Sequence, residues 1–254
     1  MAWKLGVLNV KEEISRRRMV KVSVILPAYN EADTLEAAVT KITEALDEYT
    51  EAYEIIIAED GSTDGTDKKA AALSEKLPVV KHLHSKKRLG RGRALKNAFQ
   101  ESSGEILVYM DVDLATDLRQ LKELINSVEK EGYNFATGSR MLRESNVERS
   151  DTRHIASKTY NFMVRAVLGS KIKDHQCGFK AFQRESLMQL LDEVGASHWF
   201  WDTELLVRAY LKGYKIKEIP VSWKSGRETK VRLLKDSLNM GWQIFSLWFH
   251  LKVQ

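Results

Sequence analysis

Asp111 and Asp113 are separated by one residue and follow the apolar run Ile106-Leu107-Val108. Such a run is typical of a buried strand, and the pattern after Asp117 is typical of an amphipathic helix. Two carboxylates one residue apart at a strand end can both reach one hard cation, such as Mg²⁺ or Mn²⁺. The motif alone is weak evidence, because short acidic pairs also arise by chance or as helix caps.

A second acid and a basic loop follow two other predicted strands. Asp60 follows the apolar run 54–58, separated from it by Glu59. The segment 87–93 contains four basic residues, Arg91 and Arg93 among them, and two glycines. It leads into a predicted helix, and a basic glycine-containing loop at a helix N-terminus suits a phosphate group. Open α/β sheets bind their ligands at the carboxyl ends of the strands, so these features are expected to converge.

Apolar runs and helical patterns alternate along the first half of the chain. Strands are predicted at 22–27, 54–58, 78–83, 105–110 and 133–140, and helices at 34–46, 67–77, 94–101 and 117–130. This alternation predicts an α/β fold with a mainly parallel sheet flanked by helices. In the second half we expect helices at 155–168, 198–211 and 231–252, a strand within 174–182 and a strand pair within 214–221.

Composition narrows the class of protein. A chain of 254 residues that is 43% apolar and 30% charged is typical of a globular protein with a sizeable core. The single Cys177 excludes an internal disulfide. The net charge of +5 is compatible with nucleic acid, anionic lipid or phosphorylated small molecules. No nucleic-acid partner is predicted, because the sequence has no recognisable helix-turn-helix or aromatic-interleaved sheet pattern.

Three motifs together resemble the family 2 inverting glycosyltransferases of GT-A fold. They are Leu26-Pro27-Ala28-Tyr29-Asn30-Glu31, the segment 59–66 and Asp111-Val112-Asp113. Later blocks at 138–140, 174–182, 201–206 and 218–223 are similar to the dolichyl-phosphate glucosyltransferases and dolichol-phosphate mannose synthases. The resemblance implies inverting hexosyl transfer from UDP-glucose or GDP-mannose to a polyprenyl or dolichyl phosphate, with Mg²⁺ or Mn²⁺ as cofactor.

The resemblance also implies roles for individual residues. Asp113 would be the main metal ligand, assisted by Asp111, and Asp113, Asp202 and Arg140 would be catalytic. The donor or acceptor phosphate would be held by Arg140, Arg153 and Lys230. The sequence departs from the common pattern at Glu59, where Asp is usual, and at Thr229, where Ser is usual. The nucleotide sugar would be bound by Pro27, Tyr29, Glu31, Asp60, Arg91, Arg93, Asp111 and Val112.

The acceptor determines whether a catalytic base is needed. A lipid monophosphate is largely ionised at neutral pH, since its second pKa is near 6, so it needs cations rather than a base. Asp202 would then order the acceptor site or a loop. A saccharide or other hydroxyl acceptor would require a base, for which Asp202 and Glu204 are candidates. A third interpretation is an acid pair that stabilises a helix N-terminus.

Three segments are predicted: an N-terminal extension (1–20), a catalytic domain (21–225) and a C-terminal amphipathic helix (226–254). Trp242, Phe245, Trp248 and Phe249 suit a helix that lies on a membrane surface, although the same helix could pack on the catalytic domain or across a dimer. Its apolar part is too short to span a bilayer. We expect a cytoplasmic protein, peripheral on the cytoplasmic face of a membrane.

Overall fold

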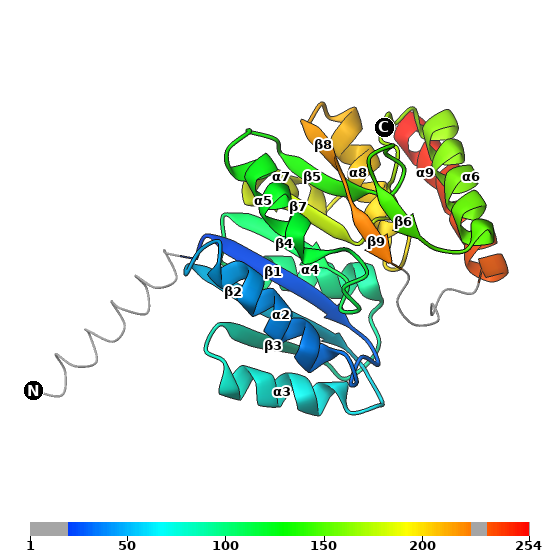
Figure 1. Ribbon diagram of the computed structural model, residues 1–254. Coiled ribbons are helices and arrows are strands. Elements are labelled where there is room, and N and C mark those ends of the chain that lie inside the picture. Colours follow the sequence, from blue (N-terminus) through cyan, green and yellow to red (C-terminus); the bar gives the residue numbers. More distant parts are fainter. Residues whose placement is uncertain (1–19, 225–232, 254) are drawn as a thin grey trace, which may run out of the picture.

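The computed structural model describes residues 20–224 and 233–253. Nearly all of the predicted N-terminal extension, the start of the predicted C-terminal helix, and Lys230 lie outside the described residues. Figure 1 shows a twisted central sheet with helices packed on both sides of it.

A seven-stranded sheet in the order β3-β2-β1-β4-β7-β5-β8 forms the centre of the molecule. Six strands are parallel, and β7 runs antiparallel between β4 and β5. The predicted mainly parallel α/β fold is therefore confirmed. The interior position of β2 explains its continuous apolar sequence, because all of its residues are buried. The strands are β1 (Val22–Ala28), β2 (Tyr53–Asp60), β3 (Val80–Ser85), β4 (Ile106–Met110), β5 (Phe135–Ser139), β7 (Phe179–Gln183) and β8 (Ile216–Pro220).

Helices cover the two faces of the sheet and enclose two apolar cores. One core lies under α2 (Leu35–Asp47), α3 (Thr66–Lys76) and α5 (Leu121–Glu129), which follows the short helical turn η1 (Leu118–Gln120). The other lies under α4 (Arg91–Glu101), α7 (Arg184–Leu191) and α8 (Trp201–Leu211). Alternate residues of each strand contribute to opposite cores, as the pleat requires: Val24 faces the first and Ile25 the second.

Two features of the second half differ from the sequence expectation. The predicted strand pair within 214–221 is wrong: β8 joins the main sheet beside β5, and the next strand, β9 (Ser222–Lys224), pairs elsewhere. Its partner is β6 (Asn146–Glu148), a strand too short and too polar to be recognised from its sequence. Helix α7 was also not predicted, because it begins one residue after β7 without a loop signal.

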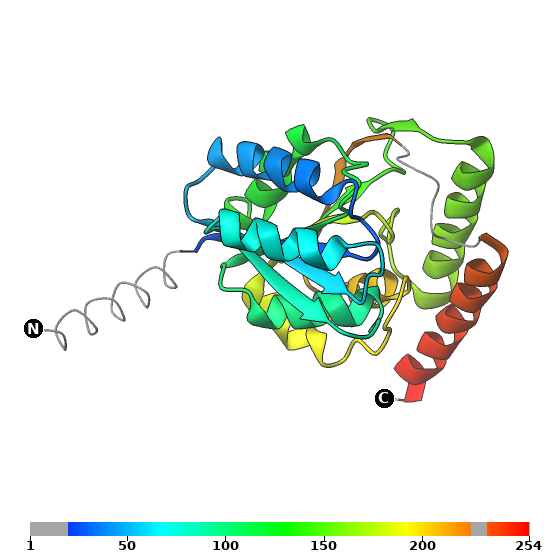
Figure 2. The same cartoon turned by 90° about the horizontal axis from the view of Figure 1, so that it is seen from below.

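The C-terminal helix α9 (Leu233–Val253) packs along α6 (Asp151–Leu168), and both lie at the periphery (Figures 1 and 2). Ile244 and Leu247 of α9 are buried with Tyr160 and Val164 of α6 in a third apolar cluster. Packing on the rest of the chain, one of the two alternatives for this helix, is therefore observed. Among the described helices, none is both long enough and apolar enough to cross a membrane.

Candidate active site

The carboxyl ends of β1, β2 and β4 meet at one edge of the sheet, because these strands are parallel and adjacent. The predicted convergence of acids and basic groups occurs there. Of the predicted nucleotide-binding residues, Arg93 is exposed and does not line the cleft at this edge, and Val112 is buried in the core. The cleft is lined by Pro27, Ala28, Tyr29, Glu31, Asp60, Arg88, Arg91, Ala94, His198 and Trp199.

Asp60 fixes the basic loop that closes one side of this cleft. Its two carboxylate oxygens accept hydrogen bonds from the backbone N–H groups of Leu89, at 2.5 Å, and Gly90, at 2.9 Å. Arg88 lies 3.8 Å above the ring of Tyr29, a favourable cation–π contact. Gly90 has a φ of +97°, and a Cβ there would lie 2.5 Å from the carbonyl oxygen of Ser197. Glycine is therefore required where the loop meets the segment before α8. Binding of the nucleotide sugar by Asp60 stays a prediction.

Arg91 links the loop to the aspartate pair. It is the first residue of α4, and its Nη2 donates to Asp111 Oδ1 at 2.5 Å, while its Nε lies 3.9 Å from Asp202 Oδ2. Burial disfavours its charge, but Asp111 and Asp202 outweigh burial and raise the pKa of the guanidinium. Arg91 Nε is buried and has no hydrogen-bond acceptor within the described chain. A cation beside a helix N-terminus makes this point of the cleft suitable for an anionic ligand.

The segment Asp111–Asp113 forms a tight turn directly after β4. Asp113 Oδ1 accepts from the N–H of Ala115 at 3.1 Å, and Leu114 has a φ of +48°. Asp113 is exposed, yet partial desolvation and the charge of Asp111 raise the pKa of its carboxyl. A Cβ on Gly178 would lie 2.0 Å from Asp111 Oδ2, so the position of Asp111 depends on glycine at residue 178. Sequence reasoning did not identify Gly178.

The donor set at this turn fits a hard divalent cation. Asp111 and Asp113 offer carboxylate oxygens, and Glu31 is close enough for its charge to raise the pKa of Asp113 further. Carboxylate oxygens are the ligands that Mg²⁺ and Mn²⁺ prefer, and the concentration of negative charge favours a cation. The predicted metal ligands are therefore brought together.

Asp202 lies at the start of α8 in a buried ion pair that the sequence did not reveal. Its Oδ1 accepts from Lys180 Nζ at 2.8 Å, and Lys180 also donates to the hydroxyl of Tyr109 at 3.2 Å. Burial raises the pKa of the Asp202 carboxyl to about 7, and the charge of Arg91 opposes that rise. Burial likewise lowers the pKa of Lys180 to about 8. Because both oxygens of Asp202 face cations, the carboxylate holds Arg91 and Lys180 together beneath the cleft.

Glu204, the other candidate base, has a structural position. Its Oε2 accepts from the backbone N–H groups of Gly195 and Ala196, and its Oε1 accepts from Arg208 Nε at 2.9 Å. Oε2 thus fixes the loop before α8, and Oε1 pairs with a residue one turn later in the same helix. Glu204 therefore has a structural role, through the loop and Arg208, whereas Asp202 belongs to the candidate site.

A second cationic centre lies next to Cys177 and the aspartate turn. Arg140 forms two side-chain hydrogen bonds with Asp174, at 2.7 and 2.9 Å. Burial opposes ionisation of Asp174, but Arg140 lowers its pKa well below the usual range. Arg149 contacts Ser157 Oγ and His154 Nδ1, and burial together with the charge of Arg140 lowers its pKa to about 10.

The charge of Arg140 lowers the pKa of Arg149, so the two guanidinium groups are neighbours that repel each other. Two like charges held close together suit a bound anion. Arg149 was not among the predicted residues, because its neighbour Arg140 is nine positions away, in the turn after β5. Arg153, which was predicted, lies on the first turn of α6 and is partly buried. Lys230 lies outside the described residues.

The chain has a GT-A-like nucleotide-sugar transferase fold. Its sheet is mainly parallel with one antiparallel strand, an aspartate pair follows β4, and cationic groups lie on either side of that pair. The profile described as "Glycosyl transferase family 2" matches residues 23–191, and the chain belongs to this family. The predicted family resemblance is therefore confirmed.

The similar proteins are glycosyltransferases. Glycosyltransferase AglD of Haloferax volcanii is 47% identical over 237 residues, covering 92% of this chain and 38% of AglD. The chain thus spans well under half of that relative. A dolichyl-phosphate beta-glucosyltransferase of Dictyostelium discoideum is 31% identical over 243 residues, covering 91% of this chain and 74% of the relative. The corresponding human protein is 30% identical, with coverages of 87% and 72%.

Solved structures support the fold. Glucosyl-3-phosphoglycerate synthase of Mycobacterium tuberculosis, in complex with Mn²⁺, UDP-glucose and phosphoglyceric acid, matches with a TM-score of 0.67 at 20% identity. The match covers 92% of this chain and 80% of that protein.

Proposed function

We propose that this chain transfers a hexose, with inversion, from a nucleotide sugar to a polyprenyl or dolichyl phosphate. The single observation that carries the proposal is the half-buried pair Arg140 and Arg149 beside the Asp111–Asp113 turn. A site for a second phosphate next to a site for a diphosphate fits a phosphorylated acceptor. The names of the relatives in Dictyostelium discoideum and human favour glucose, and hence UDP-glucose, over GDP-mannose.

The donor side of the cleft would bind and orient the nucleotide sugar. Arg91 and the N-terminus of α4 would face the diphosphate, and Tyr29, stacked under Arg88, would flank the nucleotide. Asp113 and Asp111 would hold a divalent cation, Mg²⁺ or Mn²⁺, whose charge stabilises the departing diphosphate. Asp202 and Lys180 would keep Arg91 in place while negative charge develops on the leaving group.

The acceptor side would need no general base. The acceptor phosphate oxygen is already largely ionised, so Arg140 and Arg149 have only to aim it at the anomeric carbon. Asp174 supports this role, because its two hydrogen bonds fix the orientation of the Arg140 guanidinium.

One observation favours an alternative, transfer to a saccharide or other hydroxyl. The pKa of Asp202, raised to about 7 by burial, would suit a general base at neutral pH. Against this, Asp202 is 4% exposed and bonded to Lys180, so an acceptor hydroxyl could reach it only if this pair opened. We therefore place Asp202 as a positioning residue.

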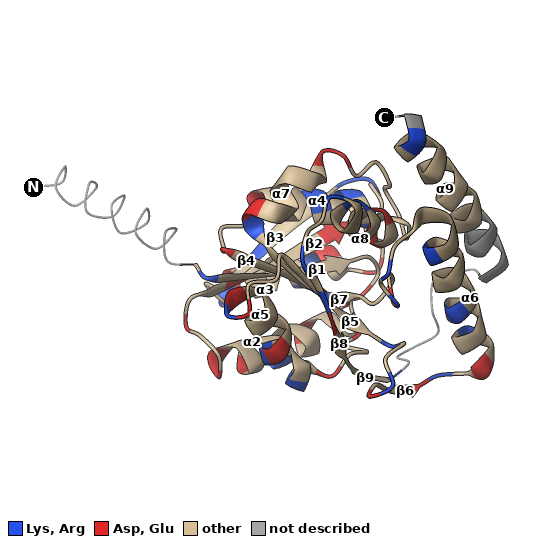
Figure 3. Cartoon of the chain, turned by 90° about the horizontal axis from the view of Figure 1, so that it is seen from above, with Lys and Arg blue, Asp and Glu red and all other residues tan. Residues whose placement is uncertain are grey.

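A membrane-facing surface would bring the lipid acceptor to the site. On α9, Trp242, Phe245 and Phe249 are 57 to 72% exposed and fall on one stripe, opposite the buried Ile244 and Leu247. On α6, Ile155 and Phe162 are exposed on a similar stripe. Figure 3 shows basic segments on both helices. Exposed aromatic and basic side chains on paired helices suit an anionic membrane surface, and we place the protein peripherally on a cytoplasmic membrane face.

Enzymatic transfer can be tested directly. The purified chain is incubated with radiolabelled UDP-glucose or GDP-mannose, Mn²⁺ and polyprenyl phosphate, and label is counted in the organic phase. We expect label from UDP-glucose that chelation of the metal abolishes. Transfer to a free saccharide but not to polyprenyl phosphate would instead establish the alternative.

Membrane contact is tested separately by flotation with vesicles containing phosphatidylserine. We expect the wild-type chain to float and Phe245→Ser/Phe249→Ser to remain soluble. The double variant should keep its activity on a short, water-soluble polyprenyl phosphate. Failure of the wild-type chain to float would exclude this surface without affecting the chemistry.

A further inference from the structure

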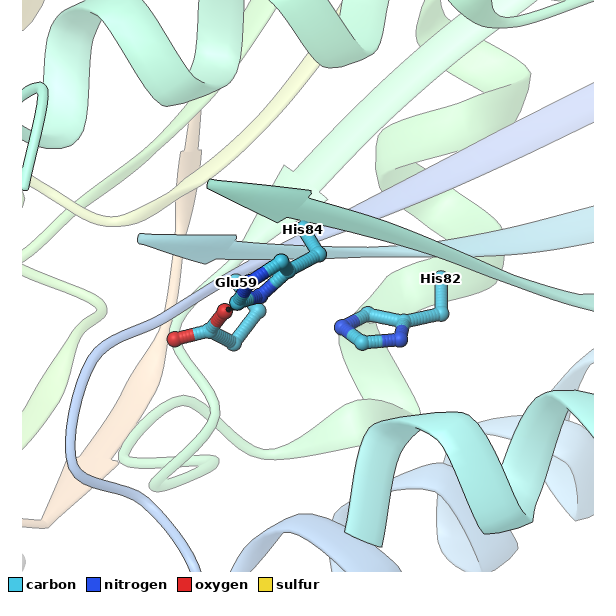
Figure 4. A group of neighbouring side chains, drawn as sticks. All are labelled: Glu59, His82 and His84. Carbon is cyan, nitrogen blue, oxygen red and sulfur yellow. Dashed lines mark hydrogen bonds and ion pairs between the residues drawn. The ribbon is translucent and has the colours of Figure 1, made fainter. Parts of the chain in front are cut away.

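Glu59, His82 and His84 form a cluster on the outer strands of the sheet, apart from the Asp111–Asp113 turn (Figure 4). His82 and His84 are two residues apart on β3, so their side chains project from the same face. Glu59 is the register partner of His84 across the β2–β3 pair. Strand pairing alone therefore brings two imidazoles and one carboxylate together.

The side chains present ligand atoms to one another. One nitrogen of each histidine and one carboxylate oxygen of Glu59 lie within 4.8 Å of one another. His84 Nδ1 is already 2.6 Å from Glu59 Oε2. Donors around one Zn²⁺ ion lie about 2.0–2.2 Å from it, so small rotations of the rings would bring all three into contact with a single ion.

His82 gives the independent reason to expect a ligand. Its Nε2 is buried and, within the described chain, has no hydrogen-bond partner. Buried polar atoms in folded proteins are almost always hydrogen-bonded, and a bound ion is a recognised explanation for an exception. An imidazole nitrogen beside a second imidazole and a carboxylate is a suitable metal ligand.

The surroundings of Glu59 would orient it for this purpose. Its Oε1 accepts from the backbone N–H of Ser62 at 2.5 Å, which leaves Oε2 directed to the histidine side. Hydrogen bonds of this kind orient the side chains that bind metal ions. Figure 4 shows Glu59 and His84 near the ends of the paired strands β2 and β3, with His82 two residues earlier on β3.

We propose that Glu59, His82 and His84 bind a borderline transition-metal dication of the Zn²⁺ class, at a site separate from the aspartate turn. The two sites differ in donor chemistry: two imidazoles with one carboxylate favour Zn²⁺, whereas carboxylates alone favour Mg²⁺ or Mn²⁺. This inference goes beyond the proposed transfer reaction and does not depend on it.

The site would stiffen the donor side of the cleft. Glu59 immediately precedes Asp60, which holds the N–H groups of Leu89 and Gly90. Ser62, bonded to Glu59, in turn accepts from the N–H of Asn30. A metal that joins β3 to the end of β2 therefore stabilises the strand end from which the nucleotide-facing loops depart.

Zn²⁺ binding by the full chain tests the proposal without any sugar transfer. The chain is stripped with chelator and dialysed against micromolar Zn²⁺ in millimolar Mg²⁺, which occupies the aspartate turn. We expect one Zn²⁺ per chain and a raised thermal midpoint. His82→Ala and His84→Ala should each weaken binding at least about tenfold. His250→Ala, which removes an exposed histidine on α9, and Asp113→Asn should bind Zn²⁺ as the wild type does.

Two outcomes would overturn the proposal. One is unchanged Zn²⁺ affinity in both His82→Ala and His84→Ala; the other is loss of Zn²⁺ in Asp113→Asn. His84 is partly exposed, with 43% of its side chain accessible, so its alanine variant should fold even if removal of His82 disturbs the edge strand. The visible spectrum of bound Co²⁺ gives a second measurement, because it reports nitrogen ligation directly and should disappear with the histidines.

Discussion

Gly178→Ala is the sharpest test of how the aspartate turn is positioned. The new Cβ would lie 2.0 Å from Asp111 Oδ2 and 2.5 Å from its Cγ. An ordinary contact of 3.4 Å requires the carboxylate to move by about 1.4 Å. The carboxylate is the movable partner, because the backbone N–H of Asp111 is bonded to the carbonyl of Gly178.

The displacement should cost activity much more than stability. Moving the carboxylate breaks its 2.5 Å contact with Arg91, and a misplacement of about 1 Å at a reacting centre can reduce turnover about a hundredfold. The core beneath is unaltered, so the free energy of unfolding should fall by only about 1–3 kcal/mol.

Initial rates of organic-phase labelling, Mn²⁺ titration and thermal unfolding measure these effects together. Gly195→Ala is the matched control, because a Cβ there has no atom within 4 Å. Wild-type turnover and Mn²⁺ affinity in Gly178→Ala would refute the idea that this approach sets the position of Asp111. Equal losses in Gly195→Ala would point to a general loss of folding instead.

Three further changes probe the remaining parts of the site. Asp113→Asn should weaken Mn²⁺ binding at least about tenfold with little change in thermal midpoint, measured by titration, because the side chain is exposed. Arg149→Gln should raise KM for polyprenyl phosphate about tenfold, the effect of one charge-assisted hydrogen bond, and leave KM for UDP-glucose unchanged; the exposed Arg143→Gln is the control. The pKa of Asp174 is depressed in the folded state, so its stabilisation is complete above its unfolded value near 3.8 and is lost as the pH falls below it. The difference in unfolding free energy between wild type and Asp174→Asn should therefore shrink between pH 5 and pH 3, and a constant difference would contradict this.

The fold was predictable where one local pattern determined it. The buried runs of β1, β2 and β4 and the amphipathic stripes of α2 and α5 identify their own elements, and parallel pairing then places Asp60 and Asp111 at one edge. The order of the strands in the sheet could not be predicted in this way, because it depends on contacts between distant segments. The insertion of β7 between β4 and β5 leaves no signature in the sequence of β7.

The site residues that were not predicted also depend on contacts between distant segments of the chain. Lys180 resembles any residue of a strand, and only its approach to Asp202, in a helix 22 positions later, makes it part of the site. Gly178 is required by a neighbour 67 positions earlier. Arg149 acquires significance from Arg140 in the adjoining loop. Each of these residues can be recognised only from its tertiary contacts, whereas the aspartate pair can be recognised from its spacing in the sequence.

The reversed direction of β7 has an evolutionary consequence. Because β7 is antiparallel, its beginning, rather than its end, lies beside the carboxyl end of β4, and the loop that carries Asp174 and Cys177 reaches the aspartate turn from the opposite half. Most residues that line the proposed donor cleft come from the first half of the chain, with His198 and Trp199 added from the second. The arginines proposed to face the acceptor, Arg140 and Arg149, both come from the second half. We expect the two halves to diversify at different rates, with new acceptor specificities arising by exchange of the segment from Arg140 to Asp174 while donor recognition is inherited unchanged.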